Sequence, residues 1–450
     1  MSLDNLPVEW SKEQLGHIVN FIDYRGKTPT KTSEGIPLIT AKNIRDGYIN
    51  REPREYIAED AYDEWMTRGI PYLGDLVITT EAPMGNVAVL NIQEKFALAQ
   101  RAICLNFRYN QSISKFTYYY LRSQSFKADL QEKATGTTVQ GIKAAELKKI
   151  FVPLAPLSEQ QEIVRQLDMM LAQVEQIKAR LDAIPAILKK FRQSVLESYF
   201  NNLASVQQVN LDDLVVSIDQ GWSPKCLNTP ASAEQWGVIK TSAIQPLYFD
   251  ASENKELPSN LKPREALSLI SGDVLITRAG PRARCGVTCI VDKDYDNLMI
   301  CDKVYRVRCD SKKISADYLN LYLNSLTGLS LIEKMKTGSS ESGMNLTQSK
   351  FKELVIPLVS LKQQLAFAKD IKKFFQLANH IEETLQLAEK RVNLLTQSIL
   401  AKAFSGELTA EWREQHQDLI TGVNSAETLL AKIQAEREVS KPVKKVKKVK

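Results

Sequence analysis

The segment "TRAGPRAR" (277–284) places three arginines, Arg278, Arg282 and Arg284, in one turn that also contains glycine and proline. A guanidinium is a planar fork of donors that binds a guanine edge or a phosphate through two parallel hydrogen bonds. A purely structural loop needs no such concentration of arginines. The segment "TTEAPMGN" (79–86) keeps the same frame with other side chains. The two segments predict nucleic-acid contacts by two loops of different specificity.

Other loops in each half carry side chains that read base edges or bind phosphate: Arg and Lys for guanine, Asn and Gln for adenine, Ser and Thr for either. The turns "TGTT" (135–138) and "TGSS" (337–340) add glycine-supported amides beside hydroxyls, which suits phosphate oxygens. For any single residue, an ordinary solvated loop is the alternative. The candidates are Lys27, Thr28, Lys31, Lys42, Asn43, Thr80, Glu81, Gln100, Arg101, Thr137, Thr138, Gln140 and Lys143 in the first half, and Trp222, Lys225, Lys240, Thr241, Ser242, Arg278, Arg282, Arg284, Lys303, Ser339, Ser340 and Ser342 in the second.

No catalytic motif is found in the sequence. "YRGKT" (24–28) ends like a phosphate-binding loop, but Phe21 occupies the position of its first glycine. The sequence has no GxSxG, no HExxH and no dinucleotide fingerprint. The six cysteines form no CxxC pair and the three histidines are scattered, so we expect reduced thiols and no metal site. We expect no catalytic residue in this chain, and partners would have to supply any chemistry.

The elements that must position these loops occur twice in the chain. Each copy mixes short β-rich runs with helical pieces, without strict alternation, which is typical of an α+β domain. Shared framework with divergent loops is what two halves that recognise different base sequences would show. The matching phrases include "GKTP" (26–29) with "GWSP" (221–224), "GDLVITTEAPMGNVAVL" (74–90) with "GDVLITRAGPRARCGVTCIV" (272–291), and "ELKKIFVPL" (146–154) with "KFKELVIPL" (350–358).

A long, glycine-poor segment follows each copy. In the first segment, apolar residues recur at alternating intervals of four and three, and positions 204 residues later are apolar too. This 3.5-residue period predicts two coiled-coil helices that pack on each other. The predicted seam consists of Ile163, Leu167, Met170, Val174, Ile177, Leu181, Leu188, Ile371, Phe374, Ile381, Leu385, Val392, Leu395 and Ile399.

Local signals mark the ends and the middle of these helices. Ser158 with Gln161, and Ser360 with Gln363, predict a capping box at each start, in which side chains satisfy the free N–H groups of the first turn. Pro185 removes a hydrogen bond inside the first helix and predicts a kink there.

We therefore expect two similar lobes at 1–157 and 204–359, long helices at 158–203 and 360–405, and a C-terminal extension at 406–450. If the helices are antiparallel, the chain is pseudo-two-fold symmetric. Proteins that read split DNA sites commonly match the local two-fold axis of the duplex. This architecture indicates a protein that recognises two DNA half-sites, with the long helices setting the distance between them.

The net charge of +6 gives little support to a polyanion partner, because the terminal "SKPVKKVKKVK" alone contains six lysines. We interpret that tail as a disordered end. A nucleic-acid surface must therefore arise from how charges are arranged. No apolar run approaches the roughly 20 residues of a membrane-spanning helix, and the N-terminus lacks the pattern of a secretory signal, which predicts a cytoplasmic protein without membrane contact.

The chain resembles the specificity subunits of type I restriction-modification enzymes, most closely those of the enterobacterial branch. The resemblance is carried by "FVPLAPLSEQQEIVRQLD" (151–168), "IPAILKKFRQSVL" (184–196), "RVNLLTQSILAKAFSGELTAEWREQ" (391–415) and the doubled lobes. It implies that each lobe is a target recognition domain for one half of an asymmetric, interrupted DNA site, and that the helices dock two modification subunits.

The resemblance also assigns the chemistry to partners. Modification subunits would bind S-adenosylmethionine and methylate adenine N6, while restriction subunits would use ATP and Mg to translocate and cleave DNA. This chain would bind no cofactor itself. One departure is that "SLKQQLAFAKD" (360–370) lacks the acidic start of "SEQQEIV" (158–164), which leaves the contact at that end of the second helix open.

Two other classes of function compete with a DNA-recognition subunit. A coiled-coil scaffold with two protein-binding lobes would show no sequence-dependent DNA binding. A stand-alone nuclease or methyltransferase would turn over substrate as an isolated chain. Discrimination between DNA sequences distinguishes a DNA-recognition subunit from the scaffold. DNA binding as such does not, because basic loops alone give nonspecific binding.

Overall fold

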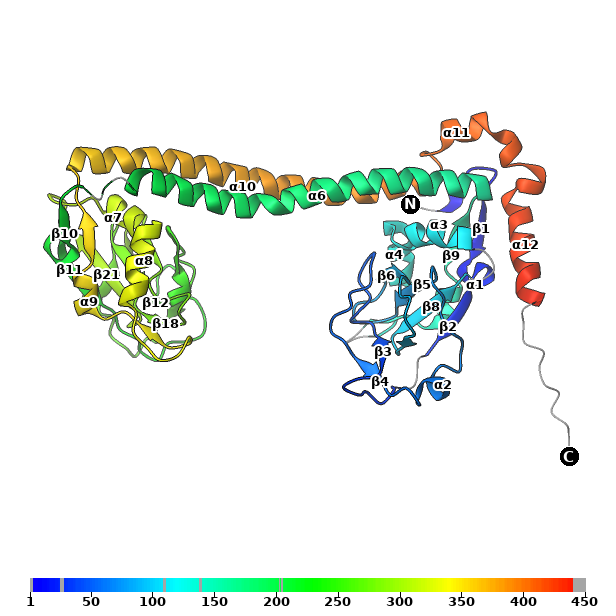
Figure 1. Cartoon of the computed structure of the whole chain (residues 1–450), viewed down its shortest axis with the longest axis horizontal. Helices are drawn as coiled ribbons and strands as arrows, with labels where there is room; N and C mark the ends of the chain where they lie inside the picture. The colour runs from blue at the N-terminus through cyan, green and yellow to red at the C-terminus, as the bar shows by residue number, and fades with distance from the viewer. Residues whose placement is uncertain are drawn as a thin grey trace. The chain divides into compact units, whose positions relative to one another are not determined.

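The computed structural model describes residues 3–24, 28–107, 111–136, 140–201, 203 and 205–439 (Figure 1). Three predicted DNA contacts, Lys27, Thr137 and Thr138, and the lysine-rich tail lie outside the described residues. The chain divides into two compact units: unit 1 comprises Met1–Leu181 and Ala388–Lys450, and unit 2 comprises Asp182–Leu387.

Each unit contains one α+β lobe. The lobe of unit 1 consists of β1 Ser11–Gln14, α1 Leu15–Ile18, β2 Asn20–Asp23, β3 Ile36–Ile39, β4 Tyr56–Ile57, α2 Tyr62–Trp65, β5 Leu76–Thr79, β6 Val87–Val89, β7 Ala97–Leu98, β8 Ala102–Asn106, α3 Gln111–Leu121, α4 Gln124–Glu132, α5 Ala144–Lys148 and β9 Phe151–Leu154. The lobe of unit 2 consists of β10 Gln208–Asn210, β11 Val215–Gln220, β12 Gly237–Ile239, β13 Ile244–Gln245, β14 Tyr248–Phe249, β15 Asn254–Glu256, β16 Ser268–Leu269, β17 Val274–Thr277, β18 Ala279–Gly280, β19 Thr288–Ile290, β20 Tyr295–Met299, β21 Val304–Cys309, α7 Ala316–Leu323, α8 Leu326–Met335, β22 Met344–Asn345, α9 Gln348–Lys352 and β23 Val355–Pro357.

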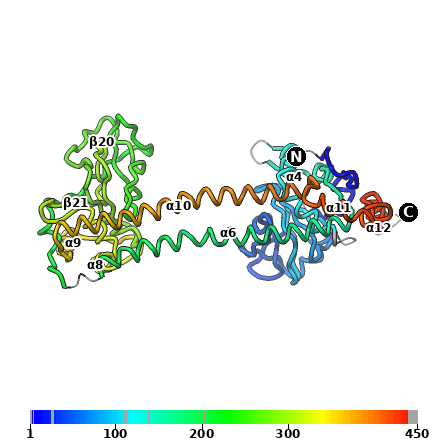
Figure 2. Tube along the Cα trace, turned by 90° about the horizontal axis from the view of Figure 1, so that it is seen from above, coloured from blue at the N-terminus to red at the C-terminus, as the bar shows by residue number. Residues whose placement is uncertain are grey.

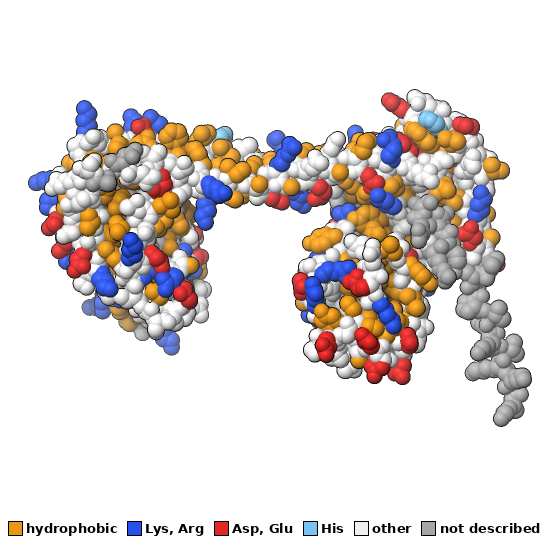
Figure 3. All heavy atoms as spheres, viewed as in Figure 1, with side chains coloured by type: hydrophobic (Ala, Val, Ile, Leu, Met, Phe, Trp, Pro, Cys, Tyr) orange, Lys and Arg blue, Asp and Glu red, His pale blue; other side chains and the backbone are white. Residues whose placement is uncertain are grey.

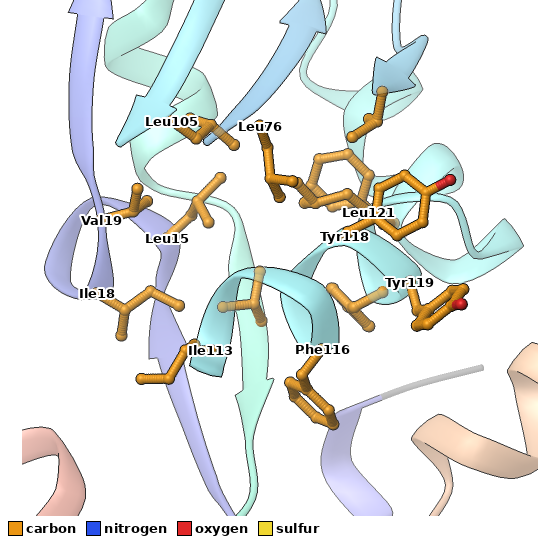
Figure 4. Packing of buried hydrophobic residues seen from close by; sticks show 14 of the residues in the cluster. Leu15, Ile18, Val19, Leu76, Leu105, Ile113, Phe116, Tyr118, Tyr119 and Leu121 are labelled. Carbon is orange, nitrogen blue, oxygen red and sulfur yellow. The ribbon is translucent and has the colours of Figure 1, made fainter. Parts of the chain in front are cut away.

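The central sheet of unit 1 has the strand order β2-β8-β5-β6, with antiparallel neighbours. Strand β5 reads "LVIT" and is apolar on both faces because both faces are buried. Its Leu76 and Ile78 belong to one core cluster, which α3 covers with Phe116, while Val77 belongs to a second cluster with Leu38 of β3. Figure 4 shows the first of these clusters, between α1, α3 and the sheet.

Unit 2 repeats this plan. Its sheet has the order β11-β21-β17-β19, and β17 likewise sends Val274 and Ile276 to one core and Leu275 to the other. A second sheet, β15-β12-β20-β16, stands where β4-β3-β7 stands in unit 1. The prediction of an α+β fold with two similar lobes is confirmed.

The two long helices are α6 (Leu157–Phe200) and α10 (Leu361–Phe404), each of 44 residues. In unit 2 the ring of Phe191 packs on Phe374 at 6.3 Å between centroids, and that of Tyr199 on Phe367 at 5.1 Å. The partner number falls as the first number rises, so the helices are antiparallel there. Figures 1 and 2 show the parts of α6 and α10 that belong to unit 2 side by side. The bounds differ from the predicted 158–203 and 360–405 by at most three residues.

The predicted seam is only partly closed. Ile163, Leu167, Val174, Leu188, Ile371 and Leu385 are buried, and Met170, Leu181, Val392 and Ile399 are half-buried. By contrast, Ile177, Phe374, Ile381 and Leu395 are exposed, which corrects the expectation of a continuous buried seam. Two helices alone leave the flanks of an apolar stripe in contact with solvent unless a further surface covers them.

The two helix starts differ from each other. The capping box of α10 is confirmed, since Gln363 N–H donates to Ser360 Oγ (3.4 Å) and Ser360 N–H donates to Gln363 Oε1 (3.2 Å). The corresponding prediction for Ser158 is wrong: α6 already begins at Leu157, so Ser158 lies inside the first turn. The helix α6 also continues through Pro185.

The C-terminal extension is part of unit 1 and contains α11 (Ala410–Gln415) and α12 (Ala426–Val439), of which α12 packs on the main core of the lobe. Its anchor is Glu159 in the first turn of α6, whose side chain is fully buried. This carboxylate accepts hydrogen bonds from Trp10 Nε1 (2.8 Å), Thr409 Oγ1 (2.7 Å) and Arg413 Nε (3.0 Å). A buried charge requires such an ion pair and hydrogen bonds. The extension thus holds the N-terminal segment and α6 together.

Candidate nucleic-acid interface

Four loops meet in the same way in both lobes. In unit 1 the N–H of Thr80 donates to the carbonyl of Arg101 (2.9 Å), and the N–H of Ile142 donates to the carbonyl of Thr80 (3.0 Å). In unit 2 the N–H of Arg278 donates to the carbonyl of Lys303 (2.8 Å), and Leu346 donates to Arg278 (2.7 Å). These are equivalent positions of the sequence repeat, so one backbone frame is built twice.

Two further contacts complete the frame. Thr135 and Gly141 exchange backbone hydrogen bonds of 2.9 Å, as Thr337 and Asn345 do at 2.7 Å. Gln100 Nε2 donates to Thr28 Oγ1 (2.8 Å) in unit 1, and at the same place in unit 2 the Ser223 hydroxyl donates to the carboxylate of Asp302. We call this the four-loop surface, formed by residues 28, 80–86, 100–101, 135–136 and 140–141 in unit 1 and by residues 222–225, 278–284, 302–303 and 337–345 in unit 2.

The side chains on the two copies differ. In unit 1 Arg101 pairs with Glu81 at 2.9 Å between Nε and Oε1. In unit 2 Arg282 pairs with both Glu333 (2.5 Å) and Glu341 (2.9 Å). These two carboxylates raise the pKa of Arg282. All of these groups are exposed, and exposed ion pairs are weak because water screens them, so a phosphate can compete for either arginine.

The three arginines of "TRAGPRAR" have three different environments. Arg278 donates from Nη1 to the carbonyl of Asp302 (2.9 Å) and lies 5.4 Å from the ring centre of Tyr305. Arg284 donates from Nη2 to the carbonyls of Thr241 and Ile244. Its guanidinium is thus used to hold the segment 241–244 in place. Arg282 alone is held by carboxylates.

Two candidates lie in the interior. Asn43 is 2% exposed; its Oδ1 accepts from Thr40, and its Nδ2 donates to the carbonyls of Asn50 (3.0 Å) and Pro53 (3.1 Å). Thr80 is equally buried and contributes only the backbone contacts described above. Both side chains shape the loops from inside and offer no surface to a ligand in this conformation.

A second group of basic side chains lies near the second sheet of each lobe. Lys31 (2.8 Å) and Lys42 (3.9 Å) share the carboxylate of Glu55. In unit 2 Lys240 (2.9 Å) and the hydroxyl of Ser242 share Glu253, and these hydrogen bonds, first from Ser242 and then from Lys240, lower the pKa of that carboxyl. Each lobe therefore repeats the pairing of a lysine with a glutamate outside the four-loop surface.

The remaining candidates line the loops. Trp222 is half-buried and stacks under the guanidinium of Arg264, 4.4 Å from the ring centre. The exposed candidates are Gln140, Lys143, Lys225, Lys303, Ser339, Ser340 and Ser342, and Thr241 is half-buried.

Sequence reasoning missed the acids that hold the basic side chains, Glu55, Glu253, Glu333 and Glu341, and the Arg264 that covers Trp222. Most of these partners lie more than ten residues away in sequence, so no local spacing marks them. The space-filling view shows the result, since basic and acidic side chains are interspersed on both lobes (Figure 3).

Within the described ranges, no group of three or more His, Cys, Asp or Glu side chains could hold a metal ion. Among the helices of those ranges, none is long and apolar enough to cross a membrane. All six cysteines are free thiols, as expected.

Comparisons with known proteins agree with this architecture. The chain is 30% identical to the EcoKI specificity subunit of Escherichia coli K12 and 29% identical to the StySPI specificity subunit of Salmonella potsdam, with 98% of each chain covered in both cases. In structure it is similar to a chain of a type I R-M system (TM-score 0.66, 20% identity) and to the HsdS subunit of Thermoanaerobacter tengcongensis (TM-score 0.54, 19% identity), each covering 89% of this chain and 98% of the other. The family model for the type I restriction modification DNA specificity domain matches residues 7–186 and 223–389, and the chain therefore belongs to this family of specificity subunits.

Proposed function

We propose that this chain is the DNA-recognition subunit of a type I restriction-modification complex, in which each four-loop surface reads one half of a bipartite, asymmetric site. The observation that carries the proposal is the duplicated backbone frame with different side chains at equivalent positions. Thr80 and Arg278 make the same two backbone hydrogen bonds, whereas one side chain is a buried hydroxyl and the other a guanidinium. Equal backbone geometry with unequal side chains is what two different half-sites require.

The exposed ion pairs give these surfaces a way to exchange partners. Arg101 is held by the carboxylate of Glu81, and Arg282 by those of Glu333 and Glu341. A phosphate or a guanine edge offers the same two-acceptor geometry, and the released carboxylate remains hydrated. The pairs thus position the arginines before binding and cost little to break. We expect Arg101 to act on the first half-site and Arg282 on the second.

The helices α6 and α10 would set the half-site spacing and dock two modification subunits. Large apolar side chains in contact with solvent mark protein contact surfaces when they cluster. The described parts of α6 and α10 expose Met169, Ile187, Leu377, Leu387 and Leu394 in addition to the exposed seam residues Ile177, Phe374, Ile381 and Leu395.

Catalysis would then belong to the partners. The modification subunits would bind S-adenosylmethionine and methylate adenine N6, and restriction subunits would use ATP and Mg to move and cleave DNA in the cytoplasm. This chain would contribute recognition and geometry only.

The experiment is to map methylated adenines in cells that carry this chain with its modification subunit. One interrupted motif with two unequal halves is the expected result. Exchange of residues 278–284 for the corresponding loop of a relative with a different target should change one half only. A change in both halves, or methylation without a motif, contradicts the proposal, and a protein-binding scaffold predicts no motif at all.

The spacing role has its own test. Leu385 is buried on α10, and a charged side chain there would open the packing of the helices. Leu385→Asp should relax the distance allowed between the two half-sites while each half keeps its bases. A strict spacing in this variant would show that something other than the helix pair sets the distance.

A further inference from the structure

The helix α12 fills a groove on the lobe of unit 1. Ile433 is buried in the main core cluster of that unit. One turn further along, Arg437 donates from Nε to Asn20 Oδ1 (3.2 Å) and from Nη1 to the carbonyls of Gly16 (2.9 Å) and His17. The space left beside Ile433 and Arg437 is only about 10 Å³. The helix therefore seals this groove with one apolar and one polar contact.

The sequence repeat assigns an equivalent groove to unit 2. Asn20 pairs with Asn106 of β8, and Ser217 pairs with Arg308 of β21, which makes Ser217 the counterpart of Asn20 and leaves Val216 as an inserted residue. The strand pairs Leu76 with Leu105, and Val274 with Val307, extend the match along β8 and β21. Phe107, which lines the sealed groove of unit 1, thus corresponds to Cys309 of unit 2.

The groove on unit 2 is open. It has a volume of about 540 Å³, and its lining includes Val216, Ile270, Cys309, Ile314, Leu361 and Leu365. Val216 is 73% exposed and Leu365 is 58% exposed. A shift in register between Val215 and Ser217 leaves Val216 without a strand partner at the rim. Solvent-facing aliphatic side chains around one concave site are a common mark of a protein contact.

The polar half of the α12 contact is already satisfied within unit 2. Lys313 Nζ donates to the carbonyl of Asp213 (2.9 Å), which is the counterpart of the His17 carbonyl bound by Arg437. Only the apolar half is left without a cover. The helix that fits there needs apolar side chains on successive turns, as Leu429 and Ile433 are placed on α12, and needs no cation.

We propose that this groove binds an amphipathic helix of one modification subunit, an inference that rests on the proposed function. Leu361 and Leu365 line the groove and belong to α10, which also exposes Phe374 and Leu377 further along in unit 2. The groove thus continues an apolar surface that the proposed function assigns to the same partner. Lys312 and Lys362 are exposed, and each is adjacent in sequence to a residue that lines the groove. Acidic side chains on the bound helix would therefore complement the charge at the rim.

The test uses the full chain and the purified modification subunit of the same system. Val216→Asp with Leu365→Asp places two carboxylates in the groove, and both sites are exposed, so the lobe should fold. The affinity for the modification subunit should fall at least tenfold, with the effect confined to one of its two binding events. Leu227→Asp is the control, since Leu227 is an exposed leucine of unit 2 outside the groove, and its affinity should equal that of the wild type.

A photo-crosslinking amino acid at position 216 gives a readout that does not depend on folding of a charged variant. It should join the chain to a helical segment of the modification subunit. Unchanged affinity of the double variant, or no crosslink in an assembled complex, overturns the inference. If the wild type still methylates one specific motif in that case, the proposed function remains valid. Loss of that methylation motif in the wild type would instead remove the proposed function itself.

Discussion

The first turns of α6 and α10 occupy equivalent places in the repeat but make different contacts. Gln160 and Gln364 are both fully buried, and each donates from Nε2 to the carbonyl five residues earlier, at 2.7 and 2.8 Å. One residue before them, the copies diverge: Glu159 is buried and binds the C-terminal extension, whereas Gln363 is exposed and closes a capping box. The start of α6 thus has a buried carboxylate that binds the extension, and the start of α10 has none at the equivalent position.

The largest effect should come from removing the buried carboxylate. Glu159→Ala leaves the cation of Arg413 and the N–H of Trp10 without their shared partner, and breaking a buried pair from one side typically costs about 3–5 kcal/mol. We expect hydrogen exchange of α11 and α12 to accelerate strongly while the lobe of unit 2 is unaffected.

Gln363→Ala is the matched change at the other helix start. It removes an exposed capping contact and should destabilise the start of α10 by no more than about 1 kcal/mol. If both variants exchange alike, the anchoring role of Glu159 is wrong.

The next effect concerns the two grooves. Ile433→Ala removes a buried side chain between α12 and the lobe of unit 1, and such truncations cost about 2–5 kcal/mol in well-packed cores. Val216→Ala, at the open groove, changes an exposed side chain and should stay within about 0.5 kcal/mol. Local unfolding measured by hydrogen exchange in α12 and in β11 would compare the two sites. Equal losses would mean that the groove of unit 2 is already covered.

Much of this organisation could be predicted from the sequence. The repeat showed which strands correspond. The segments "GDLVIT" and "GDVLIT" supply residues to two cores in each lobe, and these buried positions accept only apolar side chains. The 3.5-residue period predicted α6 and α10. The difference between "SEQQEIV" and "SLKQQLAFAKD" was visible too, but its meaning depended on Thr409 and Arg413, which lie about 250 residues away.

Side-chain roles in the loops were harder to predict. Asn43 and Arg284 are residue types that read bases, and both satisfy backbone carbonyls of their own lobe. A sequence shows the donors that a loop carries but not whether the fold uses them. The docked α12 was also missed, although Ala426, Leu429 and Ile433 have helical spacing, because its contacts lie about 400 residues away in the sequence.

The two four-loop surfaces give a smaller and more specific contrast. Arg282→Ala should weaken discrimination in the second half-site by roughly 10- to 100-fold if the guanidinium contacts a base, while the first half is unchanged. Arg101→Ala should do the reverse. Arg284→Ala should instead loosen the segment 241–244 that it holds.

Binding measured on sites with one altered base at a time separates these outcomes. An equal loss of affinity for all sequences would identify a phosphate contact. The slope of log K against log salt concentration should then decrease in magnitude by about one. Equal discrimination by the Arg101 and Arg282 variants and the wild type would remove both residues from the reading surfaces.

The smallest predicted effect tests the two helix starts directly. Ser360 accepts from the N–H of Gln363, so Ser360→Ala should destabilise the first turn of α10 by about 1 kcal/mol. Ser158 lies within α6, which begins at Leu157, and alanine is the better helix former, so Ser158→Ala should be neutral or slightly stabilising. Hydrogen exchange in the two first turns measures both. A comparable loss in both variants would mean that Ser158 caps α6 in solution; the contrast expected here would show that unit 1 fixes its helix through Glu159 and unit 2 fixes its helix through a cap.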